Sequence, residues 1–246
     1  MDETPSGDAL VARIRELRAS GATPKTIART LGVPSARVAP VLRALAAEAE
    51  SATDDADRPL VGCWINPGWN TELQVIGRPE WPTGTPADPG TAGLIRLVIA
   101  RQAPRARVRV FEYLVDAFCL GVKDVRAPKV MDQHLLDGYL SDAYASYGCL
   151  PIVAPLDLAC DLVFGSIEYA RGLGLDPSPA FTASAAAHLG RWMPPSAVTF
   201  GREGKPFYIQ GPRDDTNHIM RTLRRTVGDR NFHYLIQTGG GFPTPR

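Results

Sequence analysis

The sequence has almost no net charge, because 27 Lys and Arg residues balance 26 Asp and Glu residues and leave +1 over 246 residues. A polyanionic partner therefore has to be argued from local charge. The sequence also lacks a run of about 18 apolar residues, the length that a membrane-spanning helix needs. Its first residues are polar and acidic, unlike a secretory signal. We therefore expect a cytoplasmic protein with no membrane partner.

Paired metal-binding and redox motifs are missing as well. The cysteines show no CxxC spacing, and the histidines show neither HxxxH nor HxH spacing. The glycines at 239–241 have no helix after them, so they cannot form a phosphate-binding loop. We expect buried, reduced thiols, no metal, no cofactor and no complete catalytic set. The residues concerned are Cys63, Cys119, Cys149, Cys160, His134, His188, His218 and His233.

Three helical patterns occupy the first fifty residues. Residues 8–18 have apolar side chains at helical spacing and predict an amphipathic helix. In "TPKTIARTLG", Thr23 can cap a second helix that Pro24 begins and Gly32 follows. The stretch "PSARVAPVLRALAAEA" predicts a third helix with Ser35 as its cap.

These patterns resemble the helix-turn-helix DNA-binding family over about forty residues, 8–47. The family has a small residue in the first helix of the motif, a glycine at the turn and branched apolar residues in the second helix. Ala28, Gly32, Val38 and Val41 match this pattern and allow the helices to pack closely. The resemblance implies a three-helix DNA-binding unit. A helical hairpin of another kind is the alternative.

Local charge supports DNA binding. Residues 8–47 contain seven bases and two acids, an excess that can neutralise phosphates. Arginines that only solvate short helices are the alternative explanation. The bases are Arg13, Arg15, Arg18, Lys25, Arg29, Arg37 and Arg43.

In this family, the start and outer face of the second motif helix meet the major groove. The resemblance implies that arginines of that helix contact bases, that bases of the preceding helix hold phosphates, and that the serine caps the helix and contacts the DNA backbone. Pro40 should bend this helix or delay its start. Because the helix has few base-reading side chains, we expect a homodimer that sums two half-sites, or a unit that docks on RNA, a ribosome or a protein. The implied DNA-binding residues are Lys25, Arg29, Ser35, Arg37 and Arg43.

The next segment, "EAESATDDADRP" at 48–59, carries five acids and one base and is interpreted as a solvated spacer. Short apolar runs with Gly and Pro between them then predict strands and turns. The expected fold class is α+β, with a small all-α helix-turn-helix unit joined by an acidic linker to a larger mixed, mainly antiparallel α+β domain. The expected boundaries are 8–50 for the first domain, 51–59 for the linker, 60–236 for the large domain and 237–246 for a flexible tail.

Within the large domain, residues 93–101 and 107–118 are rich in β-branched and aromatic side chains and predict an antiparallel hairpin. The stretches "YLVDAFCLGVKD", "GSIEYARGLG" and "FGREGKPFYIQGP" resemble an uncharacterised bacterial domain that spans much of 94–235, which implies one domain and no activity. The other expected elements are helices over 131–147, 155–173 and 215–228, the last capped by Asp215 or Thr216, a hairpin turned at Glu203 and Gly204, and a strand over 231–236.

The stretch "VDAFCLGVKD" is the most site-like part of the large domain. It collects Asp116, Cys119, Lys123 and Asp124 at the end of a predicted strand, where loops present functional groups. A thiolate beside a lysine would be a nucleophile. The alternative is a core cysteine with an ordinary surface ion pair between Lys123 and Asp124.

The function expected from these patterns is DNA binding by a transcriptional regulator, with a C-terminal dimerisation or sensing domain. An RNA-, ribosome- or protein-docking factor that uses the small unit as an adaptor is the alternative. An enzyme that uses this unit for targeting is a third possibility, for which the sequence shows no complete catalytic set.

Overall fold

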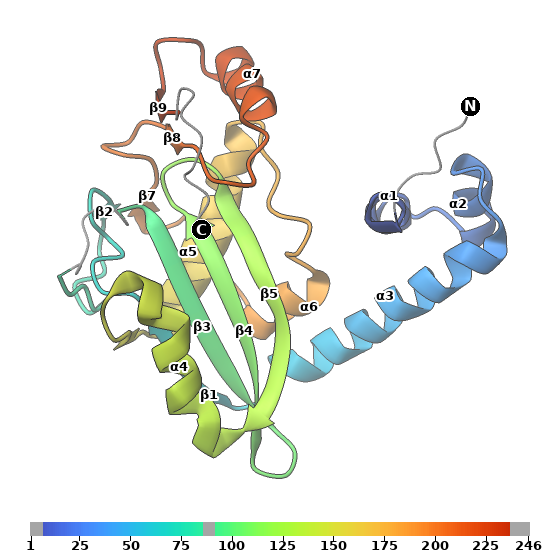
Figure 1. The fold of residues 1–246 in the computed structure, drawn as a ribbon, viewed down its shortest axis with the longest axis horizontal. Helices are drawn as coiled ribbons and strands as arrows, with labels where there is room; N and C mark the ends of the chain where they lie inside the picture. The colour runs from blue at the N-terminus through green and yellow to red at the C-terminus, as the bar shows by residue number, and fades with distance from the viewer. Residues whose placement is uncertain (1–6, 86–91, 237–246) are drawn as a thin grey trace, which may run out of the picture.

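The structure, a computed structural model, describes residues 7–85 and 92–236. Three helices form a small unit at the N-terminal end of the chain. The third of them, the long helix α3 (Ser35–Ala56), starts in this unit and reaches a larger α+β domain at its other end (Figure 1). The α+β class and the mainly antiparallel sheet are confirmed. The predicted flexible tail, 237–246, lies outside the described residues. Within the described ranges, no helix is both long and apolar enough to cross a bilayer.

A small apolar core holds the three-helix unit together. The first two helices are α1 (Gly7–Ala19) and α2 (Pro24–Thr30). Thr23 caps α2 by accepting a hydrogen bond from the amide of Thr26 at 3.2 Å, as predicted. Gly32, at φ +62°, turns the chain between α2 and α3 in a conformation that other residues adopt at a cost. The buried core residues are Leu10, Ile14, Ile27, Ala28 and Val38.

Helix α3 corrects the sequence prediction in three ways. It begins at Ser35, so this residue occupies the first helical position instead of capping the helix. It runs through Pro40, which does not delay its start. It continues to Ala56, so most of the predicted linker, 51–59, is helical. Residues 44–50 consist only of Ala, Leu and Glu, which are strong helix formers, and this composition carries the helix into the acidic segment.

The main sheet contains β1 (Leu60–Ile65), β3 (Leu94–Ala103), β4 (Arg107–Asp116), β5 (Gly121–Asp132) and β6 (Ile152–Val153). The strand order is β5-β4-β3-β1-β6, and every neighbouring pair is antiparallel. The predicted hairpin is confirmed as β3 and β4, whose turn holds Arg105 and Ala106 at positive φ. Strand β5 replaces the loop that was expected after β4. Two bulges and Pro128 interrupt its alternation, and an edge strand tolerates both.

Helices cover both faces of this sheet (Figure 1). Helix α4 (Leu136–Tyr144) packs on one face, where Val108 is buried. Helices α5 (Leu156–Gly172) and α6 (Ala183–Leu189) pack on the other face, where Phe111 is buried. Because successive side chains of β4 alternate between these faces, the strand is buried on both sides.

The predicted helix over 131–147 is shorter in the structure. Its first two residues belong to β5, and 3-10 turns at Gln133–Leu135 and Ala145–Tyr147 flank α4. The predicted helix over 155–173 is confirmed as α5.

The C-terminal part contains β7 (Val198–Thr199), β8 (Phe207–Ile209), α7 (Thr216–Thr226) and β9 (His233–Leu235), and β7 pairs with the earlier strand β2 (Gln74–Val75). The predicted turn at Glu203 and Gly204 is confirmed, because Arg202 and Lys205 bridge across it. The prediction of a hairpin around this turn is wrong, because β7 pairs with β2 and β8 pairs in parallel with β9. Asp215 caps α7 by accepting a hydrogen bond from the amide of His218 at 3.0 Å.

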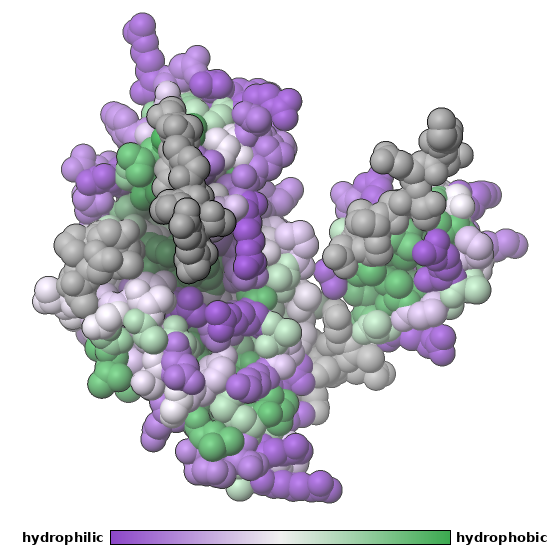
Figure 2. All heavy atoms as spheres, in the orientation of Figure 1, coloured by the Kyte–Doolittle hydropathy of each residue, from purple (hydrophilic) through white to green (hydrophobic). Residues whose placement is uncertain are grey.

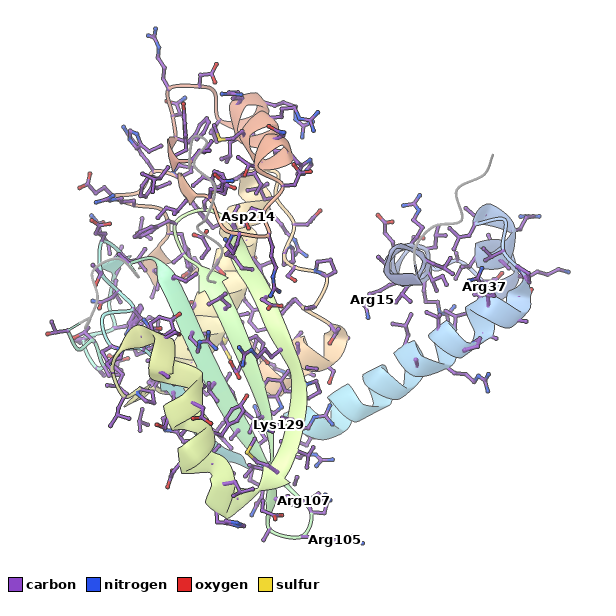
Figure 3. All side chains as sticks on the ribbon, in the orientation of Figure 1. Arg15, Arg37, Arg105, Arg107, Lys129 and Asp214 are labelled. Atoms are coloured by element: carbon purple, nitrogen blue, oxygen red, sulfur yellow. The ribbon has the colours of Figure 1, made fainter. Side chains whose placement is uncertain are left out.

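Helices α3 and α1 both contact the large domain. Helix α3 packs against α6. Arg15 of α1 also donates a hydrogen bond to the carbonyl oxygen of Pro179 at 3.2 Å, and Figure 3 shows this side chain on the side of α1 that faces the large domain. The segment before α6 therefore contributes to the position of the whole unit.

We expect Gly121→Ala to lower the free energy of unfolding by at least about 2 kcal/mol. Gly121 has φ +66°, and a Cβ there would lie 2.7 Å from the carbonyl oxygen of Ser166 in α5. Gly138→Ala is the matched control, because its added methyl meets no atom within 4 Å on α4 and should be neutral or stabilising by up to about 1 kcal/mol. Urea unfolding measures both. Equal losses in the two variants would contradict the close packing of β5 on α5.

Candidate functional site

The corner formed by α2 and the start of α3 is a candidate nucleic-acid interface. Residues 24–45 contain four bases and no acid. Hydrophilic side chains surround the rim of the three-helix unit, and apolar side chains lie between them (Figure 2). The corner therefore presents positive charge that no acid of its own segment neutralises. All five implied DNA-binding residues are exposed there: Lys25, Arg29, Ser35, Arg37 and Arg43.

Helical geometry divides these bases into two groups. Lys25 and Arg29 are four residues apart on α2 and share one side of that helix. Arg37 and Arg43 are six residues apart, so their side chains leave α3 about 120° apart. Figure 3 places Arg37 near the start of α3, next to α2. Arg37 is therefore the base-reading candidate closest to α2, and Arg43 flanks it.

Small side chains surround these arginines. Ser35, Ala36 and Ala39 are exposed on the first turns of α3. They let a partner approach the helix backbone closely, but they discriminate poorly between bases. Base recognition by this face depends on Arg37 and Arg43.

The residues of the possible site predicted from "VDAFCLGVKD" lie close together, but each has its own structural partners. The carboxylate of Asp116 accepts hydrogen bonds from the amides of Phe118 and Cys119, both at 3.0 Å, and so closes the connection between β4 and β5. Burial raises the pKa of Asp116 to about 6, although nearby Lys123 opposes this shift. This carboxylate has a structural partner on the backbone of its own turn.

Cys119 is a core residue. Its side chain is buried with Ala170, Leu173 and Tyr208. Burial, and secondarily the charge of Asp116, raises the pKa of the Cys119 thiol far above its ordinary value. The thiol is therefore protonated at neutral pH, which makes it a weaker nucleophile than an ordinary thiol.

Lys123 and Asp124 line a cavity of about 470 Å³, together with charged side chains of β3, β4 and the segment before α7. Lys123 forms its ion pair with Asp214, at 3.1 Å, and not with Asp124 as the sequence suggested. The carboxylate of Asp214 also accepts hydrogen bonds from the hydroxyl of Tyr208 and from the amide of Gly211. Figure 3 shows Asp214 at the end of β5 that lies nearest α7.

Glu112 also lines this cavity, and sequence reasoning did not select it. Its side chain is 3% exposed and pairs with Arg96 at 2.6 Å and with Arg126 at 3.3 Å. The hydroxyl of Tyr139 donates a third hydrogen bond, and burial together with this bond raises the pKa of Tyr139. One feature of the sequence could have identified Glu112. It is the charged residue on the face of β4 that also carries Val108, Val110 and Leu114, and a charge on an apolar face needs a partner.

The Glu112 cavity combines paired carboxylates with an unsatisfied donor. The carboxylate of Glu112 pairs with Arg96, and that of Asp214 pairs with Lys123. The Nε of Arg96 is buried without a hydrogen-bond partner among the described residues. A buried, unsatisfied donor favours an additional acceptor at that place. Across 7–85 and 92–236, no cluster of three His, Cys, Asp or Glu side chains could hold a metal ion.

Comparisons with known protein families, with curated proteins and with solved structures find no match to this chain. Both resemblances inferred from the sequence, to the helix-turn-helix family and to a bacterial domain, therefore stay predictions. The functional argument rests on the geometry of the basic corner and of the large domain.

Asp116→Asn is expected to change how stability depends on pH. The folded-state pKa of Asp116 is raised from 3.8 to about 6, so its contribution to stability is present below the unfolded-state value and is lost as pH rises through about 6. The variant keeps an oxygen that accepts the two amide hydrogen bonds. From about pH 4 to about pH 7, the variant should gain up to about 3 kcal/mol relative to the native protein.

Urea unfolding across this pH range measures the difference. Asp176→Asn is the control, because this side chain is 93% exposed and should show no comparable trend. A constant difference between Asp116→Asn and the native protein would contradict the burial of an ionisable Asp116.

Proposed function

We propose that this protein binds DNA through the corner of α2 and α3 and acts as a transcriptional regulator. The observation that carries the proposal is the exposed, acid-free basic corner on a three-helix unit with its own core. In this proposal Lys25 and Arg29 hold phosphates, and Arg37 reads a base edge in the major groove. Arg43 adds a second contact beside it.

The large domain serves as the dimerisation or sensing part of the regulator. A single unit with two candidate base-reading arginines gives weak sequence discrimination, since each good bidentate contact contributes about 1–3 kcal/mol. A homodimer that presents two units to adjacent half-sites sums these contributions. Helix α3 runs without interruption from the basic corner to the large domain and supports such a fixed arrangement.

Docking on RNA, a ribosome or a protein is the second candidate. The small exposed residues Ser35, Ala36 and Ala39 favour it, because they offer a close surface with little base-reading chemistry. This alternative predicts no preferred DNA sequence.

Selection from a random DNA pool, at two salt concentrations and with structured RNA in parallel, tests the proposal. An enriched palindromic sequence supports a dimeric regulator. If no DNA sequence is enriched and binding to RNA or a ribosome resists salt, the three-helix unit docks on RNA or a ribosome and the DNA-binding proposal is wrong.

Arg37→Ala is expected to weaken binding to the selected sequence by about 1–3 kcal/mol, or roughly fivefold to 150-fold, because a bidentate base contact is lost. Fluorescence anisotropy with the selected duplex and with a scrambled duplex measures this loss. Arg171→Ala is the control, since this arginine lies on α5 of the large domain with a 61% exposed side chain. Equal losses on both duplexes would make Arg37 a phosphate contact.

Lys25→Ala is expected to weaken binding to selected and scrambled DNA equally, because a phosphate contact carries no sequence information. The slope of the logarithm of affinity against the logarithm of salt concentration should fall by about 1. Salt titrations of the variant and of Arg171→Ala measure it. A loss confined to the selected duplex would overturn the phosphate assignment.

A further inference from the structure

The Glu112 cavity, of about 470 Å³, is lined by two side chains of opposite charge that lack partners. Asp124 lies on β5 and is half-buried, and Arg213 lies in the segment before α7 and is exposed. Among the residues that the structure describes, neither side chain forms a hydrogen bond or an ion pair, with the other or with a third residue. A half-buried carboxylate without a partner favours a donor from outside the chain.

The register of the main sheet sets the floor of the cavity around Asp124. Arg96 of β3, Leu114 of β4 and Asp124 of β5 lie in one row across three strands, so they share a face of the sheet. Because neighbouring strands are about 4.8 Å apart, the Cα atoms of Arg96 and Asp124 are about 10 Å apart, with Leu114 between them. Arg96 pairs with Glu112 at 2.6 Å instead. Asp124 is therefore an anion beside an apolar side chain.

The segment that carries Arg213 is tied to β5 by the next residue. The carboxylate of Asp214 accepts hydrogen bonds from Lys123 at 3.1 Å, from the amide of Gly211 at 2.8 Å and from the hydroxyl of Tyr208 at 3.3 Å. A Cβ at Gly211 would lie 2.8 Å from the Nζ of Lys123, so the segment approaches β5 closely. Since Asp214 pairs with Lys123, the guanidinium of Arg213 keeps its charge for another partner.

We propose that the Glu112 cavity binds an amino acid, a zwitterion that carries one ammonium and one carboxylate group. The ammonium lies against Asp124, the carboxylate lies against Arg213, and the carbon chain packs over Leu114. A simple anion fits less well because Asp124 repels it, and a simple cation fits less well because Arg213 repels it. The volume lies in the range of small-molecule sites.

The cavity is adjacent to a contact of the three-helix unit, and this part of the inference rests on the proposed function. Ser178 lines the cavity, and its amide donates a hydrogen bond to the carbonyl oxygen of Val122 on β5 at 2.9 Å. The next residue, Pro179, accepts the hydrogen bond from Arg15 of α1. An amino acid that binds one position of this segment more tightly than another therefore biases the position of the three-helix unit.

Ligand-observed NMR and calorimetry on the full-length protein test the site with compounds of equal chain length. The zwitterions are ε-aminocaproate and L-norleucine, caproate lacks the ammonium, and hexylamine lacks the carboxylate. At least one zwitterion should bind at least about tenfold more tightly than both singly charged compounds, because only it meets both unpaired groups. The tighter zwitterion identifies the spacing of the two charges. Equal affinities for all compounds, or no binding of either zwitterion up to about 10 mM, would overturn the proposal.

Two variants assign the two charges. Asp124→Asn should weaken binding of the zwitterion by about tenfold or more and remove its advantage over caproate. Arg213→Gln should do the same and remove its advantage over hexylamine. Arg225→Gln is the control, because this arginine is exposed on α7 and does not line the cavity.

Thermal unfolding shows whether each variant is folded. If Asp124→Asn fails to fold, Arg213→Gln decides the matter, since it changes an exposed side chain without a partner among the described residues. Unchanged affinity and unchanged preference in Arg213→Gln would place the ligand elsewhere and contradict the proposal.

Measurements with and without DNA separate this inference from the proposed function. The titrations need no DNA, so they decide the cavity even if the protein binds none, and that failure would count against the regulator alone. In the native protein, the zwitterion should shift affinity for the selected duplex by about fivefold or more, and Asp124→Asn should lose this shift. Unchanged DNA affinity in the presence of bound zwitterion would contradict the coupling through Ser178 and Pro179.

Discussion

Burial of β4 on both faces is the constraint on which the rest of the large domain depends. The strand pairs with β3 and β5 along its length, and helices cover both of its faces, so its polar side chains need partners inside the protein. Glu112 finds Arg96 and Arg126 on one face, and Arg109 finds Ser184 on the other. The Glu112 cavity arises at the first of these polar positions, and Arg126 lines it as well.

The chain builds two separate cores and joins them with one helix. The core of the three-helix unit comes from α1, α2 and α3 alone, whereas the large domain buries its side chains around the sheet. The contact between Arg15 and the Pro179 carbonyl is polar and exposed, unlike the apolar packing within each core. Small polar contacts of this kind are the parts of a structure that a ligand can shift at low cost.

Local signals explain what could be predicted from the sequence. The apolar spacing of α1 and α5, the caps at Thr23 and Asp215, and the β-branched runs of β3 and β4 each act within a few residues. The sequence analysis did not predict strand β5, because bulges and Pro128 break its alternation of apolar and polar side chains. The partners of Lys123 and Glu112 could not be predicted from the sequence. They lie on other elements, and tertiary packing, which the spacing of residues along the chain does not encode, brings them together.

Because helix α3 is uninterrupted, a small change of angle at one end produces a large displacement at the other. At 1.5 Å of rise per residue, its 22 residues span about 33 Å, with the basic corner at one end and α6 near the other. A tilt of about 10° at the large domain would displace the start of α3 by about 6 Å. Successive base pairs are about 3.4 Å apart, so this displacement exceeds one base-pair step. In a dimer, a small angular change at the two junctions would therefore alter the spacing between half-sites that the pair of units can reach.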